Sequence, residues 1–149
     1  MALQNQVMDA LKAAMKAKDA VALESLRAIK SAILLQQSEA GAKELSSTDE
    51  IKLLQKLVKQ RKDSAALYKE QGRSDLAEPE LAQAKVIEQF LPEPLSETDL
   101  DQLIKEVIND LSAEGMKDMG RVVGEVNSRA AGRAEGKVIA QKVKDHLSN

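Results

Sequence analysis

Apolar residues recur every three or four positions along almost the whole chain, and this spacing constrains the fold more than any other feature. The clearest example is the set Leu100, Leu103, Ile104, Val107, Ile108 and Leu111. Such a stripe is one face of an amphipathic helix. β-branched residues occur singly or in pairs, not in the alternating runs of a strand, and we find no internal repeat. The pattern predicts an all-α protein.

A pair of prolines divides the helical pattern into two parts. Pro92 and Pro94 force extended backbone in the segment Phe90–Leu95, so we place the domain boundary there. We expect an N-terminal four-helix domain (residues 1–91), a proline hinge (92–96) and a C-terminal compact three-helix module (97–149). A chain of 149 residues with 43% apolar content can bury a core without disulfides or metals.

Capping residues predict where several helices begin and end. We expect Asp19 to cap the second helix, and Ser47 or Thr48 to open the third. In the C-terminal module, Gly115 is expected to end the fifth helix and Asp118 to cap the sixth.

The residue types that enzymes need are scarce. Zero cysteines exclude disulfides, thiolate ligands and a cysteine nucleophile. The single histidine, His146, has no second histidine with which to build a zinc site or a hydrolytic triad. We therefore expect no catalytic residue, no metal and no cofactor. No apolar run approaches the ~20 residues of a membrane span, and we expect a cytoplasmic location and no membrane partner.

The stretch from Gly115 to Lys137 differs most from ordinary helical sequence. It holds five of the seven glycines and a row of cations. We predict RNA-phosphate binding by Lys117, Arg121, Arg129, Arg133 and Lys137. We predict a role in close helix packing, or in close approach of a ligand to the backbone, for Gly120, Gly124, Asn127, Gly132 and Gly136. Spacing alone does not choose between packing and binding.

Charge alternates in blocks although the net charge is only −2. Residues 51–73 carry seven Lys or Arg against two acids, residues 95–114 carry one against six, and residues 115–149 carry seven against four. Either neighbouring helices neutralise one another, or the basic blocks converge on one face. The secondary basic candidates are Arg27, Lys30, Lys59, Arg61 and Lys62.

For three of these secondary candidates the sequence also allows explanations other than RNA binding. Arg27 and Lys30 flank an apolar stripe, where such side chains usually extend their charged ends to solvent and serve no further purpose. Arg61 falls on an apolar seam, which predicts either an ion pair with a neighbouring helix or a bound anion.

Tyr68 and Phe90 are the only aromatic residues. Sequence-specific recognition of single-stranded RNA by base stacking is therefore disfavoured, and contact with the backbone of folded RNA is favoured.

Several segments of the chain resemble the GatB/YqeY family, and within it the YqeY-like proteins. The matching strings are LRAIKSAI (26–33), KQRKDSAALY (59–68), GRSDLAE (72–78), FLPEPLSE (90–97), KDMGRVVGEV (117–126) and GRAEGKVIAQKVKDHL (132–147). The resemblance implies an all-helical protein whose C-terminal module is similar to the tail of the B subunit of the tRNA-dependent amidotransferase. In that enzyme the tail contacts tRNA, and the chemistry resides in other domains or subunits. The positions that match the family motif are Lys117, Asp118, Met119, Gly120, Gly124, Gly132, Arg133, Gly136 and Lys137.

The resemblance implies a tRNA-binding accessory protein for tRNA-dependent amidation, within a family of carbon–nitrogen ligases that use glutamine as amide donor. We expect no catalysis by this chain alone. The alternative is a protein-interaction module that docks on an aminoacyl-tRNA synthetase or an amidotransferase subunit. The chain departs from the family pattern at Val123, where Met is expected, at Glu135, where Asp is expected, and at Pro79.

Overall fold

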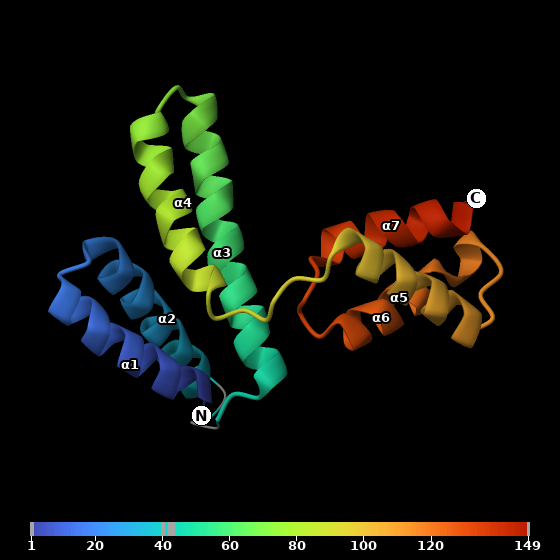
Figure 1. The fold of residues 1–149 in the computed structure, drawn as a ribbon, viewed down its shortest axis with the longest axis horizontal. Coiled ribbons are helices and arrows are strands. Elements are labelled where there is room, and N and C mark those ends of the chain that lie inside the picture. The colour runs from blue at the N-terminus through green and yellow to red at the C-terminus, as the bar shows by residue number, and fades with distance from the viewer. Residues whose placement is uncertain (1, 40, 42–43, 149) are drawn as a thin grey trace. The chain divides into compact units, whose positions relative to one another are not determined.

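The computed structural model describes residues 2–39, 41 and 44–148, and every regular element in this part is helical. The prediction of an all-α protein is therefore confirmed (Figure 1). In chain order the elements are α1 (Ala2–Ala17), α2 (Ala20–Glu39), α3 (Ser47–Glu70), α4 (Ser74–Glu88), α5 (Glu97–Asp110), the 3-10 helix η1 (Met116–Asp118), α6 (Met119–Ala130) and α7 (Gly136–Ser148).

The chain divides into two compact units, Met1–Leu91 and Pro92–Asn149. Four helices in the first unit and three α-helices with η1 in the second are compatible with the expected four-plus-three arrangement. Each unit has its own apolar core, so each is described by itself.

The N-terminal unit consists of two helical hairpins. Figure 1 shows α1 folded back on α2, and α3 folded back on α4 through a tight turn at Gly72. The core of the unit is formed where α2 packs between α1 and α4. Its largest fully buried side chains are Ile29, Ile33, Leu54 and Ile87.

The C-terminal unit packs α5, α6 and α7 around one another. Its buried residues are Leu100, Ile104, Val107, Val122, Val126, Ala130, Ile139 and Val143. The expected stripe on the fifth helix supplies three of these, and its other members are partly buried against the same core. This packing sets which faces of α6 and α7 remain open to solvent.

Some predicted caps are correct and others lie one to several residues away. Asp19 accepts a bond from the backbone N–H of Ala22, which confirms its cap. The third helix is capped by Ser46, not by Ser47 or Thr48. The Ser46 hydroxyl and the Asp49 carboxylate each bind the other's backbone N–H, forming a capping box.

The expected end of the fifth helix is wrong, whereas the sixth helix begins after Asp118 as expected but without the expected side-chain cap. The fifth helix ends at Asp110, because Ser112 takes the left-handed conformation (φ 51°) and the Ala113 N–H bonds back to the Ile108 carbonyl. Gly115 instead precedes the unforeseen helix η1. Asp118 flanks α6 without a side-chain cap, because its carboxylate is taken by the Glu114 N–H and by Arg121.

Candidate nucleic-acid interface

Helix α6 exposes two flanks of different chemistry on either side of its buried face. Gly120, Gly124 and Asn127 follow the i, i+4, i+7 spacing of one helix face, which we call the small-residue flank. Arg121, Glu125 and Arg129 follow i, i+4, i+8 and form the arginine flank. The predicted glycines and arginines therefore do not lie in one patch.

The small-residue flank is open. A Cβ atom built on Gly120 or Gly124 would meet no atom within 4 Å, apart from the helix's own nearby backbone. Both residues are exposed and have ordinary helical backbone angles. Close packing within the described part of the C-terminal unit therefore does not explain these two glycines.

The flank ends beside the start of α7. A Cβ on Gly136, the first residue of α7, would lie 4.0 Å from Asn127 Oδ1. The turn between the helices passes through Ala131 (φ 48°) and Gly132 (φ 82°), both left-handed. The role of Gly132 is thus explained by backbone conformation, which glycine adopts at little cost. Gly136 is exposed at the foot of the flank.

On the arginine flank, Arg129 is held by two acids. Its Nη1 lies 2.9 Å from Asp110 Oδ2 at the end of α5, and its Nε lies 3.0 Å from Glu125 Oε1. These two carboxylates raise the pKa of Arg129. Three charges that sum to −1 attract a phosphate poorly, so this arginine primarily joins α6 to α5.

Lys117 and Arg121 also have acidic partners. Lys117 Nζ lies 3.5 Å from Glu114 Oε2, and Arg121 Nη2 lies 3.1 Å from Asp118 Oδ1. The backbone N–H of Glu114, and secondly Arg121, lower the pKa of Asp118, so this carboxylate stays ionised. Both cations are well exposed, but their charge is largely balanced locally.

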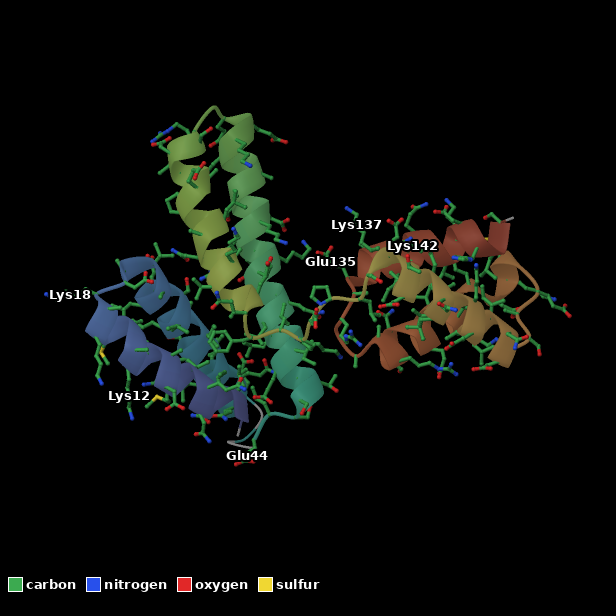
Figure 2. All side chains as sticks on the ribbon, viewed as in Figure 1. Lys12, Lys18, Glu44, Glu135, Lys137 and Lys142 are labelled. Carbon is green, nitrogen blue, oxygen red and sulfur yellow. The ribbon has the colours of Figure 1, made fainter. Side chains whose placement is uncertain are left out.

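The remaining two predicted cations lie near the start of α7. Arg133 donates from Nε to the Glu93 carbonyl at 2.8 Å, and its own carbonyl accepts from the Leu95 N–H at 2.8 Å. Arg133 thus clips the proline segment to the C-terminal unit. Lys137 is exposed, and Figure 2 shows its side chain extending away from α7. Within the described part of the chain it has no ion pair.

The secondary basic candidates belong to the N-terminal unit, and the structure gives several of them local partners. Lys59 pairs with Asp63, and Lys62 with Glu88. Arg61 is half-buried. It donates to Gln83 Oε1 at 3.0 Å and to the Leu57 carbonyl at 3.1 Å, and no acid pairs with it among the described residues. The expected ion pair is wrong, because a neutral amide on α4 takes that place.

A polar cluster between α5 and α7 was missed by sequence reasoning. Asp101 Oδ1 lies 3.1 Å from both Lys142 Nζ and His146 Nε2, and Lys142 also reaches Glu97. These two partners, His146 first, lower the pKa of Asp101. The i, i+4 spacing of Lys142 and His146 was a signal that both face the same neighbour. The cluster joins two helices and lacks a nucleophile.

The described residues offer neither a metal-binding cluster nor a membrane-spanning helix. No group of three or more His, Cys, Asp or Glu side chains is arranged to hold a metal ion in this part of the chain. None of the helices described here is both long and apolar enough to cross a membrane.

Comparison with known proteins identifies relatives that match most of the chain. A protein from Pyrenophora tritici-repentis named "Altered inheritance of mitochondria protein 41, mitochondrial" is 31% identical over 139 residues, covering 91% of this chain and 75% of that protein. The protein of the same name from Clavispora lusitaniae is 32% identical over 127 residues, covering 81% and 72%. A Saccharomyces cerevisiae protein, again of that name, is 29% identical over 122 residues, covering 78% and 66%.

These names contradict one expectation. The relatives are named as mitochondrial proteins, so the expected cytoplasmic location is wrong. That expectation accompanied the lack of a membrane-spanning apolar run, which does not distinguish one aqueous compartment from another. The family model described as "Yqey-like protein" matches residues 4–147. The chain belongs to the family of YqeY-like proteins.

Proposed function

We propose that the protein binds the sugar–phosphate backbone of folded RNA, with tRNA as the expected form, through the small-residue flank and the start of α7. In this role it is a non-catalytic accessory to tRNA-dependent amidation, as the resemblance to the amidotransferase tail implies. The proposal is narrower than the one drawn from sequence, because it no longer depends on all five cations.

The observation that carries the proposal is the pair of exposed glycines on α6, with Gly120 in the first turn and Gly124 in the interior. A glycine in a helix interior, as Gly124 is, costs the helix ~1 kcal/mol relative to alanine. No atom within 4 Å of Gly120 or Gly124 explains why these two positions lack a side chain. A ligand that approaches the helix backbone closely would explain it, because a side chain would block the approach. Phosphates and riboses can contact a backbone in this way where small residues leave room.

Two features beside the flank suit a phosphate. Lys137 forms no ion pair among the described residues, although the exposed Glu135 lies two residues before it. Lys137 is the second residue of α7, where the helix dipole also favours negative charge. Arg133 lies three residues before α7 and uses Nε for its clip to Glu93. Its terminal nitrogens make no hydrogen bond within the described residues.

The test is a fluorescence anisotropy titration with tRNA at several salt concentrations. We compare Lys137→Gln with Arg121→Gln, which loses the same charge from the arginine flank. Lys137→Gln should weaken binding and flatten the slope of log K against log salt by about 0.7–0.9, the value of one lost phosphate contact. Arg121→Gln should change the slope by less, because Asp118 already faces that guanidinium.

Three results contradict the proposal. They are no binding at low salt, equal affinity for tRNA and an unrelated DNA duplex, and equal loss in the two variants. The alternative function, docking on a synthetase or an amidotransferase subunit, predicts protein partners that survive nuclease treatment of a lysate before pull-down. Partners that disappear with the RNA support the RNA proposal.

A further inference from the structure

An apolar strip with two free cations lies on the outer face of the α1–α2 hairpin, in the unit that the RNA proposal does not use. Its members come from facing sides of the two helices. We call it the α1–α2 strip, and it consists of Met8, Leu11 and Met15 of α1 and Leu23, Arg27, Lys30 and Leu34 of α2.

The geometry of the hairpin brings these residues together. Val7 and Met8 line one small hollow with Lys30 and Ile33, so the Met8 side of α1 faces the Lys30 side of α2. Because consecutive helices in a hairpin run antiparallel, a step toward Met15 on α1 is matched by a step back toward Leu23 on α2. The i, i+3, i+7 spacing on α1 and the i, i+4, i+7, i+11 spacing on α2 keep each set on one face.

The strip exposes apolar side chains that nothing in the N-terminal unit covers. Met8 is 40% exposed, Met15 55% and Leu34 49%. Leu11 and Leu23 lie between them and are partly buried against the core. Exposed methionines, whose side chains are unbranched and adaptable, are typical of surfaces that receive a helix.

The charge on the strip has one sign. Arg27 and Lys30 are exposed, and neither has an ion pair or hydrogen bond among the described residues. Lys12 lies beside the strip on α1, and Figure 2 shows its side chain extending outward. Among the neighbouring acids, Asp9 follows Met8 directly and so is turned about 100° from it, and Glu24 borders the strip three residues before Arg27 without forming an ion pair with it among the described residues.

We propose that the α1–α2 strip binds an acidic amphipathic helix of a partner protein. Two antiparallel helices offer a groove for a third, whose apolar residues would cover Met8, Met15 and Leu34. Acidic residues on its edges would pair with Arg27 and Lys30. The strip runs about 16 Å along α2 at ~1.5 Å per residue, which accommodates a helix of about three turns.

Other occupants fit the strip less well. Base stacking of RNA needs aromatic side chains, and the strip has none. Helices that lie in a membrane surface usually contribute Trp or Phe, whereas this chain has no Trp and its one Phe is residue 90. A second copy of the chain is the remaining occupant, and the experiment below distinguishes it.

Methionine methyl groups provide the readout for the test, using full-length protein with ¹³C-labelled methionine. Met8 and Met15 report on the strip, and Met116 and Met119 in the C-terminal unit are internal controls. The probe is a designed helix of about 14 residues, with Leu along one face and Glu on both edges. Its counterpart has Lys in place of every Glu.

The Glu peptide should shift the Met8 and Met15 methyl signals saturably and leave Met116 and Met119 unchanged. The protein with Arg27→Glu and Lys30→Glu should bind it about tenfold more weakly or worse, and should prefer the Lys peptide. The matched control with Lys52→Glu and Lys56→Glu, two exposed lysines of α3, should bind the Glu peptide within about twofold of the original protein.

Four results would overturn the proposal. The first is equal binding of the Glu and Lys peptides to the original protein. The second is a shift of Met8 and Met15 with phosphatidylcholine–phosphatidylglycerol vesicles but not with the peptide. The third is a shift of the same signals with tRNA alone. The fourth is a shift that follows protein concentration together with dimerisation in sedimentation. The first, second and fourth results leave the RNA proposal unchanged because it rests on α6 and α7, whereas the third would extend RNA contact to the N-terminal unit.

Discussion

Replacing Gly124 by alanine should stabilise the C-terminal unit and weaken RNA binding at the same time. Gly124 lies in the interior of α6, is exposed, and has open space around the site of a new Cβ. The only folded-state effect of the added methyl group is therefore the helix propensity, ~1 kcal/mol in favour of alanine. For a unit as small as Pro92–Asn149 this raises the Tm by about 4–8 °C.

The two units must be followed separately, and the sequence permits this. Tyr68 is the only tyrosine, there is no tryptophan, and Tyr68 lies in α3, so its fluorescence reports on the N-terminal unit. The Met119 methyl signal reports on the C-terminal unit. Gly124→Ala should raise the melting temperature seen at Met119 and leave that seen at Tyr68 unchanged.

A matched glycine provides the control. Gly72 also has open space around a new Cβ, but its φ is +72° in the turn between α3 and α4. Gly72→Ala should therefore cost about 1 kcal/mol from backbone strain and lower the transition seen at Tyr68. The same chemical change is thus predicted to have opposite signs at the two positions.

Two outcomes of the Gly124→Ala experiment would refute the reasoning. A lower melting temperature at Met119 would mean that the small-residue flank packs against part of the protein. A higher melting temperature with unchanged tRNA affinity would mean that the glycine does not serve backbone approach. The expected result, a more stable unit with weaker binding, cannot arise from general unfolding.

Three further substitutions have predicted outcomes. Ser46→Ala removes half of the capping box of α3 and should cost ~1 kcal/mol at the Tyr68 transition. Arg133→Met removes the hydrogen bond to the Glu93 carbonyl and should lower the Met119 transition by about 0.5–1 kcal/mol, since the site is exposed. Asp101 has a pKa below its ordinary 3.8 when folded, so its carboxylate stabilises the fold above that pH and loses this contribution as the pH falls through the lowered value. Asp101→Asn should therefore flatten the acid-induced loss of C-terminal stability, measured at Met119 from neutral pH downward.

The helices were predictable because their apolar spacing is local. Leu100, Ile104 and Val107 are buried as their periodicity requires. Helix ends were less predictable, since several residues compete for each cap. Ser46 with Asp49 and Ser47 with Glu50 both have the spacing of a capping box, and the structure forms the first of the two. Ser112 ended α5 in a left-handed conformation that favours glycine, so the nearby Gly115 was a misleading signal.

The candidate site was only partly predictable, because charge along the sequence does not reveal charge in space. The excess of cations after Gly115 is real, but Arg129 meets Asp110, which lies nineteen residues earlier in the most acidic block. The explanation in which basic and acidic helices neutralise one another thus applies to the arginine flank. The spacing of the glycines correctly predicted that Gly120 and Gly124 share one face of a helix. It did not predict whether another helix covers that face, because this depends on the path of α7.

This division of α6 determines which mutations can test RNA binding. Charge reversal at Arg129 would place a third carboxylate beside Asp110 and Glu125, and the α5–α6 contact would weaken by like-charge repulsion. Lost RNA binding in that variant would follow from a disturbed fold as readily as from a lost phosphate contact. Lys137 has no such role in the described structure, so its substitution changes the charge presented to a ligand and leaves the helix contacts intact. The test of the proposed function therefore rests on Lys137 and the small-residue flank, with Arg121 of the arginine flank as the control.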